Sequence, residues 1–154
     1  MRLALLTTAA LAAFALPAAA QSELERLETA SEAAGQNMAT FMIARAPQLE
    51  PVMVDWEWDE EMREVGQCTL NEIRSVGGDQ AATDYVVAME AFATTQITSM
   101  EQMGAATPVP LNEDVAMTIA TTCRAMEVSM RRMEESGMMQ MMMDPATMQA
   151  LMSE

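Results

Sequence analysis

The sequence predicts an all-α protein: an antiparallel four-helix bundle followed by a short methionine-rich helical tail. Apolar residues recur every three or four positions in four long stretches, and no stretch shows the alternation of a strand. Methionine, which is apolar, flexible and a good helix former, occurs 19 times and supplements the scarce aliphatic residues. We therefore expect a signal peptide at 1–20, a four-helix domain at 21–137 and the tail at 138–154.

Residues 1–20 have the pattern of a secretory signal peptide. Arg2 precedes an apolar stretch from Leu3 to Leu16, Pro17 ends that stretch, and small residues lead up to Ala20. An apolar run of this length is too short to span a bilayer. We expect cleavage after Ala20, a periplasmic or secreted mature protein, and no transmembrane segment in it.

The first two helices are predicted from their caps and their apolar spacing. Ser22, with Glu25 three residues later, has the spacing of a capping box, and the periodicity that follows ends at Pro47. The second helix is expected to begin near Asp59 and to end at Gly77–Gly78. The connection between the two helices is expected to be a loop or a short extra helix.

The third helix is expected to follow at once from Asp79 and to run through Met103 with the clearest apolar stripe in the chain. The segment 104–111 contains two prolines and is predicted as a loop. Asn112 then caps a fourth helix that ends at Gly137. Four residues in the middle of these two stripes are predicted to be buried: Met89, Phe92, Met126 and Met130.

The chain contains two cysteines, and both lie on predicted helix faces. Two such cysteines in an oxidising compartment most often pair, so we predict a structural disulfide between Cys68 and Cys123. Neither cysteine has C-x-x-C spacing or a neighbouring lysine or histidine that would favour a reactive or metal-binding thiol.

The tail carries five methionines within the six residues 138–143, and Asp144 followed by Pro145 predicts a last short helix. No single helical face can bury all five, so we expect an exposed thioether patch. Thioethers are soft ligands that select Cu(I), which gives an alternative function as a Cu(I)-binding or copper-tolerance protein. In that alternative the ligands are Met139, Met141, Met142 and Met143. The leading interpretation needs no cofactor.

Residues 55–61 combine alternating acids with two tryptophans. Trp56 and Trp58 supply contact area for a possible partner patch, and the acids around them would select a basic partner. The simpler interpretation is that the tryptophans cover one end of the bundle, while the acids favour the start of the next helix through its dipole.

The charge restricts the function further. With 23 acidic residues against 8 basic ones, all arginine, the formal charge is −15, which excludes nucleic acid as the main partner. The chain has no histidine and no lysine, so the usual general bases are missing and we predict that it is not an enzyme. The leading hypothesis is a non-catalytic, exported, acidic helical protein that acts by binding a protein or a small ligand.

Overall fold

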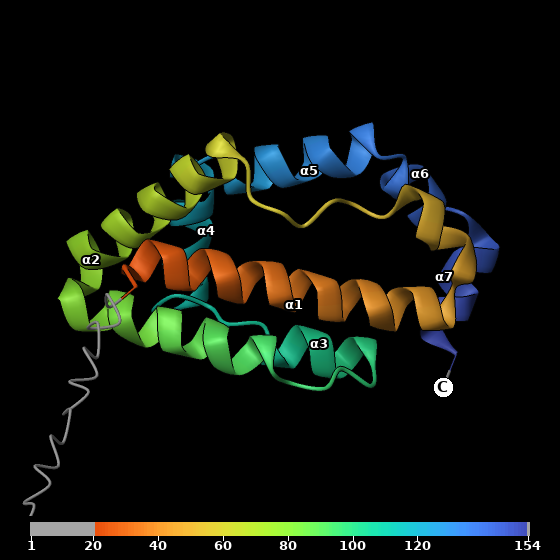
Figure 1. The fold of residues 1–154 in the computed structure, drawn as a ribbon, viewed down its shortest axis with the longest axis horizontal. Coiled ribbons are helices and arrows are strands. Elements are labelled where there is room, and N and C mark those ends of the chain that lie inside the picture. Colours follow the sequence, from red (N-terminus) through yellow and green to blue (C-terminus); the bar gives the residue numbers. More distant parts are fainter. Residues whose placement is uncertain (1–20, 154) are drawn as a thin grey trace, which may run out of the picture.

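The computed structural model describes residues 21–153 (Figure 1). Within this range the chain forms seven α-helices and one 3-10 helix, and no strand is present. The predicted all-α class is therefore confirmed. No helix between residues 21 and 153 is both long enough and apolar enough to cross a membrane. The predicted signal peptide, residues 1–20, lies outside the described residues.

Helix α1 (Glu23–Arg45) begins at the predicted capping box. The Glu25 backbone N–H donates to the Ser22 hydroxyl at 3.2 Å, and the Ser22 N–H donates to the Glu25 carboxylate at 2.8 Å. Because Pro47 cannot continue the α-helix, the chain turns at Ala46 into the 3-10 helix η1 (Pro47–Val52). The connection is therefore partly a short extra helix, one of the two predicted forms.

Helix α2 (Glu60–Ala93) joins the predicted second and third helices. It begins next to Asp59, as expected, and the Asp59 carboxylate caps it by accepting the Met62 N–H at 2.9 Å. Gly78, at φ 82° and ψ 175°, breaks the helical backbone and bends the chain sharply (Figure 1). In Figure 1 the two arms diverge from this point, and α1 runs between them. The predicted break at Gly77–Gly78 is thus confirmed.

The later helices are shorter than predicted. The third helix was expected to reach Met103, but α2 ends at Ala93 and a separate helix α3 (Met100–Ala106) follows. The fourth predicted helix is divided at Arg124 into α4 (Glu113–Thr122) and α5 (Ala125–Glu135). Because of these interruptions, the predicted antiparallel four-helix bundle is not confirmed.

The division at Arg124 changes which residues are buried. Arg124 adopts φ 60°, so the apolar series that buries Ile119 and Cys123 in α4 does not continue in phase into α5. Val128 is only 1% exposed, whereas Met126 and Met130 are 48% and 51% exposed. The predicted burial of these two methionines is wrong. In α2, Phe92 is buried as predicted and Met89 is partly buried.

The burial of Val128 rather than Met126 and Met130 can be tested by alanine substitution. We expect Val128→Ala to lower the free energy of unfolding by about 2 kcal/mol, because it removes buried methyl groups and leaves a cavity. Met126→Ala and Met130→Ala shorten side chains that are about half exposed and should each cost less than about 0.5 kcal/mol. Urea unfolding followed by circular dichroism measures all three. A loss at Met126 or Met130 as large as the loss at Val128 would contradict the register of α5.

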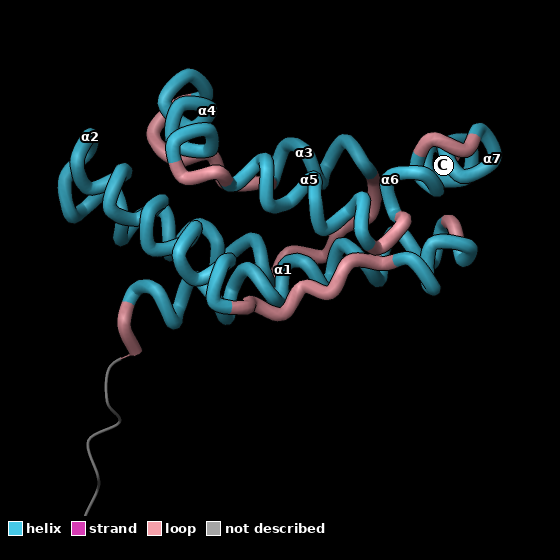
Figure 2. Tube along the Cα trace, turned by 90° about the horizontal axis from the view of Figure 1, so that it is seen from above, coloured by secondary structure: helices cyan, strands magenta, loops and turns pink. Residues whose placement is uncertain are grey.

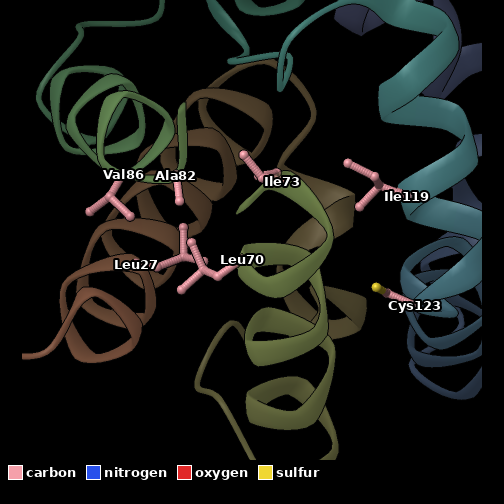
Figure 3. Close-up of a cluster of buried hydrophobic side chains, with 7 residues drawn as sticks. All are labelled: Leu27, Leu70, Ile73, Ala82, Val86, Ile119 and Cys123. Carbon is pink, nitrogen blue, oxygen red and sulfur yellow. The ribbon is translucent and has the colours of Figure 1, made fainter. Parts of the chain in front are cut away.

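Most of the buried apolar residues form two clusters. The first cluster joins α1, the two arms of α2, and α4, and Figure 3 shows its side chains meeting between these helices. It consists of Leu27, Leu70, Ile73, Ala82, Val86, Ile119 and Cys123. The second cluster joins the end of α1, η1, the loop after η1, and the helices α6 (Met138–Met142) and α7 (Pro145–Met152). It consists of Phe41, Met42, Ala46, Leu49, Val54, Met138 and Leu151.

The two clusters occupy different ends of the molecule. In Figure 2, α4 lies at one end, with the first cluster, and α6 and α7 lie at the other, with the second. Helix α7 begins where the sequence predicted, because the Asp144 carboxylate accepts the backbone N–H groups of Ala146 and Thr147. The long helix α1 contributes to both clusters and connects the two ends.

Candidate functional site

The tryptophan loop, residues 53–59, connects η1 to α2 and contacts both clusters. Trp56 packs against the second cluster, and Trp58 packs against the first. Both side chains are partly buried. The two tryptophans therefore pack inward on the helices, as the simpler of the two interpretations expected, and the partner patch stays a prediction.

Two glycines within helices provide the space for these indoles. A Cβ atom at Gly35 in α1 would lie 2.4 Å from Cδ2 of Trp56, and a Cβ at Gly66 in α2 would lie 2.4 Å from Cζ3 of Trp58. Glycine inside a helix costs about 1 kcal/mol relative to alanine, so its presence at both positions requires a compensating contact. The packing of Trp56 on Gly35 and of Trp58 on Gly66 is that contact.

Hydrogen bonds hold the tryptophan loop to the helices on either side. The Trp58 backbone N–H donates to the Glu32 carboxylate of α1 at 2.8 Å. From α5, the Arg132 guanidinium donates to the Glu57 carbonyl at 3.1 Å and lies 3.5 Å from the Asp59 carboxylate. The loop is thus fixed to α1 on one side and to α5 on the other.

A cavity of about 310 Å³ lies beside the tryptophan loop. Its wall is built by α1, the loop, both arms of α2, and α5, together with Thr107 and Pro108. Four aromatic side chains line it: Trp56, Trp58, Tyr85 and Phe92. Four thioethers line it as well: Met38, Met62, Met89 and Met133. The cavity is thus lined by a member of the second cluster and by partly buried residues that pack against each of the two clusters.

The cavity wall contains few polar groups. The indole Nε1 of Trp56 is buried and has no hydrogen-bond acceptor among residues 21–153. Burial raises the pKa of the Tyr85 phenol, so that side chain is neutral at physiological pH. The carboxylate of Asp55 accepts the Glu57 backbone N–H at 3.0 Å, and Arg132 is engaged by the loop as described above. Both charged groups of the wall thus make hydrogen bonds within the tryptophan loop, whereas the Trp56 N–H makes none.

The cysteines lie apart from this cavity. Cys68 of α2 and Cys123, at the end of α4, are at disulfide distance, with Cα atoms 5.6 Å apart. The predicted pairing is confirmed by this geometry. Since Cys123 belongs to the first cluster and Cys68 packs against it, the bridge fastens α4 to α2.

The tail methionines do not form the exposed patch that was predicted. Met138 is 4% exposed and belongs to the second cluster, and Met141 and Met142 pack against that cluster. Met139 is partly buried, whereas Met143 is 77% exposed. Met138, Met141 and Met142 therefore lie in or against the second cluster. No group of three or more cysteine, aspartate or glutamate residues suited to a metal ion occurs among residues 21–153.

The copper alternative remains a prediction that one variant tests. If the four tail methionines bind Cu(I), the variant M139L/M141L/M142L/M143L should lose anaerobic Cu(I) binding that the wild type shows. Leucine has a similar volume to methionine, so the melting temperature of the variant should stay close to that of the wild type. Cu(I) binding that survives in the variant would contradict a site made of these four residues.

The close packing of the two indoles on Gly35 and Gly66 can be tested by alanine substitution. Alanine normally stabilises a helix relative to glycine, but we expect Gly35→Ala and Gly66→Ala to lower the free energy of unfolding by about 1–3 kcal/mol each, because the new methyl group collides with an indole. Gly104→Ala in α3 is the matched control: a Cβ there meets nothing within 4 Å, so this change should stabilise by about 0.5–1 kcal/mol. If urea unfolding shows the same change in the free energy of unfolding at all three positions, the close packing of the indoles on Gly35 and Gly66 is contradicted.

The sequence signals for this site were indirect. The two tryptophans were predicted to cover one end of the bundle or to form a partner patch, and the four thioethers of the wall were each assigned to the apolar stripe of a separate helix. Glycines at 35 and 66, inside otherwise regular helical patterns, were the remaining signal of a close approach. Comparison of the chain with protein-family models, with curated proteins and with solved structures gave no match.

Proposed function

We propose that this chain is a non-catalytic, exported protein that binds a small apolar ligand in the cavity beside the tryptophan loop. The observation that carries the proposal is the cavity itself. Its volume of about 310 Å³ lies at the lower end of the range typical of small-molecule sites, about 300–1,000 Å³. Such sites are predominantly lined by apolar and aromatic side chains with a few polar groups, which matches this wall.

The kind of side chain in the wall supports an apolar ligand. Aromatic rings supply large rigid contact surfaces, and methionine side chains adjust their shape to what they enclose. Tyr85 remains a neutral phenol, and the charges of Asp55 and Arg132 are already engaged by the loop. A ligand entering the cavity would therefore gain mainly from the burial of apolar surface.

Further features support export and the absence of catalysis. The pattern of residues 1–20 is typical of an export signal, and paired cysteines are typical of oxidising compartments. A chain without histidine or lysine lacks the usual general bases, and the one carboxylate in the wall, Asp55, accepts a backbone N–H of the loop. These features favour binding over catalysis.

Binding of the fluorescent apolar probe N-phenyl-1-naphthylamine tests the proposal. We expect the purified protein to give a saturable rise in probe fluorescence. Ser129 lies in the wall on α5 and is exposed to solvent, so Ser129→Phe should fill the cavity without disturbing the core. The variant should bind the probe at least about tenfold more weakly, the equivalent of about 1.4 kcal/mol.

Ser75→Phe is the matched control, because Ser75 is exposed on α2 and lies outside the cavity wall. It should bind the probe like the wild type. Absence of saturable binding in the wild type, or equal affinity in the wild type and Ser129→Phe, would contradict the proposed function.

A further inference from the structure

This inference rests on the proposed function and concerns how the cavity holds its ligand. We infer that α5 is a lid, which pivots toward the chain segment after α3 when an apolar ligand enters the cavity. Met126 and Met130 of α5 then become part of the ligand-binding surface.

The cavity has a buried floor and a mouth that opens to solvent. Ala34, Val54 and Phe92 line the cavity and are buried. Ser129 of α5 and Thr107, the residue after α3, also line it and are exposed. Figure 1 shows α5 and α3 apart from each other, and Figure 2 shows both on the same side of α1. The mouth therefore lies between α5 and the end of α3.

The face of α5 at this mouth is mainly apolar and only partly covered. Its four residues are three or four positions apart and so lie on one side of the helix: Met126, Ser129, Met130 and Met133. Ser129 and Met133 line the cavity. Met126 and Met130 are 48% and 51% exposed. A movement of α5 over a bound ligand would remove apolar surface of both methionines from water, which favours the closed position.

The helical backbone is interrupted at both ends of α5. Arg124, before the helix, has φ 60°, and Gly137, after it, has φ 82°. Hinges in proteins are a few residues at the ends of elements that absorb a change in φ and ψ. Cys123, which precedes Arg124, is fixed to α2 by its bridge to Cys68. Helix α5 can therefore move as a unit while α4 stays in place.

Another edge of α5 supplies the pivot. Val128 is the buried residue of this helix, and Arg131 and Arg132 lie three and four positions after it, on the same edge. Arg131 pairs with Glu61 of α2, and Arg132 lies 3.5 Å from the Asp59 carboxylate. Partly exposed ion pairs such as these contribute little to stability, so a small displacement of the helix about this edge disturbs little.

A distance between two spin labels tests the movement. Nitroxide labels are attached through p-acetylphenylalanine, which leaves the cysteines unlabelled, at the exposed positions Glu134 of α5 and Glu101 of α3. We expect saturating N-phenyl-1-naphthylamine to shift the distance distribution, measured by double electron–electron resonance, to shorter values.

Labels at Asp114 of α4 and Glu101 of α3 are the matched control. Because the disulfide holds α4 to α2, the probe should leave this distance unchanged. An unchanged distance between α5 and α3 with the probe bound, or an equal change in both pairs, would overturn the inference.

Probe affinity tests the role of the two methionines. The variant M126Q/M130Q should bind the probe about fivefold more weakly than the wild type, because closure places both side chains against the ligand. Its free energy of unfolding without the probe should stay close to the wild-type value, because both side chains are about half exposed there.

M148Q/M152Q is the control for this measurement. Its two methionines have the same spacing on α7, are 42% and 73% exposed, and lie outside the cavity wall, so it should bind the probe like the wild type. Equal affinities of the two variants would overturn the inference. Failure of the probe to bind the wild type would instead overturn the proposed function, and this inference with it.

Discussion

Removal of the Cys68–Cys123 bridge is expected to lower the free energy of unfolding by about 4 kcal/mol, which is the value of the chain-entropy model for a loop of this length. The sequence separation of 55 residues means that the bridge removes much of the freedom of the unfolded chain. The bridge also holds Cys123 within the first cluster. Because small domains are marginally stable, a loss of this size is a large part of the total.

Urea unfolding of the oxidised protein and of the same protein in dithiothreitol measures this loss. The variant C68A/C123A is the control, since its unfolding should be the same with and without the reductant. If oxidised and reduced wild type unfold at the same urea concentration, the bridge makes no contribution and the prediction is wrong.

Leu151→Ala is expected to lower the free energy of unfolding by about 2–5 kcal/mol, the range for truncation of a buried leucine. Leu151 is 3% exposed and belongs to the second cluster, together with Leu49 of η1 and Phe41 of α1. Truncation would leave a cavity between segments more than 100 residues apart in sequence, at the end of the molecule that α7 closes.

Met152→Ala is the matched control, because the neighbouring side chain is 73% exposed and should cost less than about 0.5 kcal/mol. Thermal unfolding of the two variants side by side measures the difference. Equal stabilities would mean that α7 does not complete the core and that residues 138–154 are a separate tail, as the sequence first suggested.

The sequence determined the features that depend on neighbouring residues. Ser22, Asn112 and Asp144 cap helices as predicted, and the helix predicted to begin near Asp59 begins there. These starts were predictable because a cap side chain reaches only to the backbone two or three residues ahead. The break at Gly77–Gly78 was likewise predictable, because a positive φ is readily adopted by glycine. The cysteine pairing followed from their number and the expected compartment alone.

Only part of the candidate site could be predicted in this way. The tryptophans were recognised as unusual, but their inward packing depends on Gly35 and Gly66, which approach them from two different helices. The four thioethers of the cavity come from α1, from both arms of α2, and from α5. No spacing within one helix shows that side chains from separate helices share a space.

The burial or exposure of Met126, Met130 and Met138 was decided by the tertiary structure, and the physical reason is the same for all three. Met126 and Met130 lie on a well-formed apolar stripe, yet the left-handed residue Arg124 turns that stripe toward solvent and buries Val128 instead. Met138 sits in a run that no single helix face can bury, yet η1 and the end of α1 lie close enough to cover it. Periodicity indicates that a face is apolar, but burial depends on which surface lies opposite, and that surface comes from residues far away in the chain.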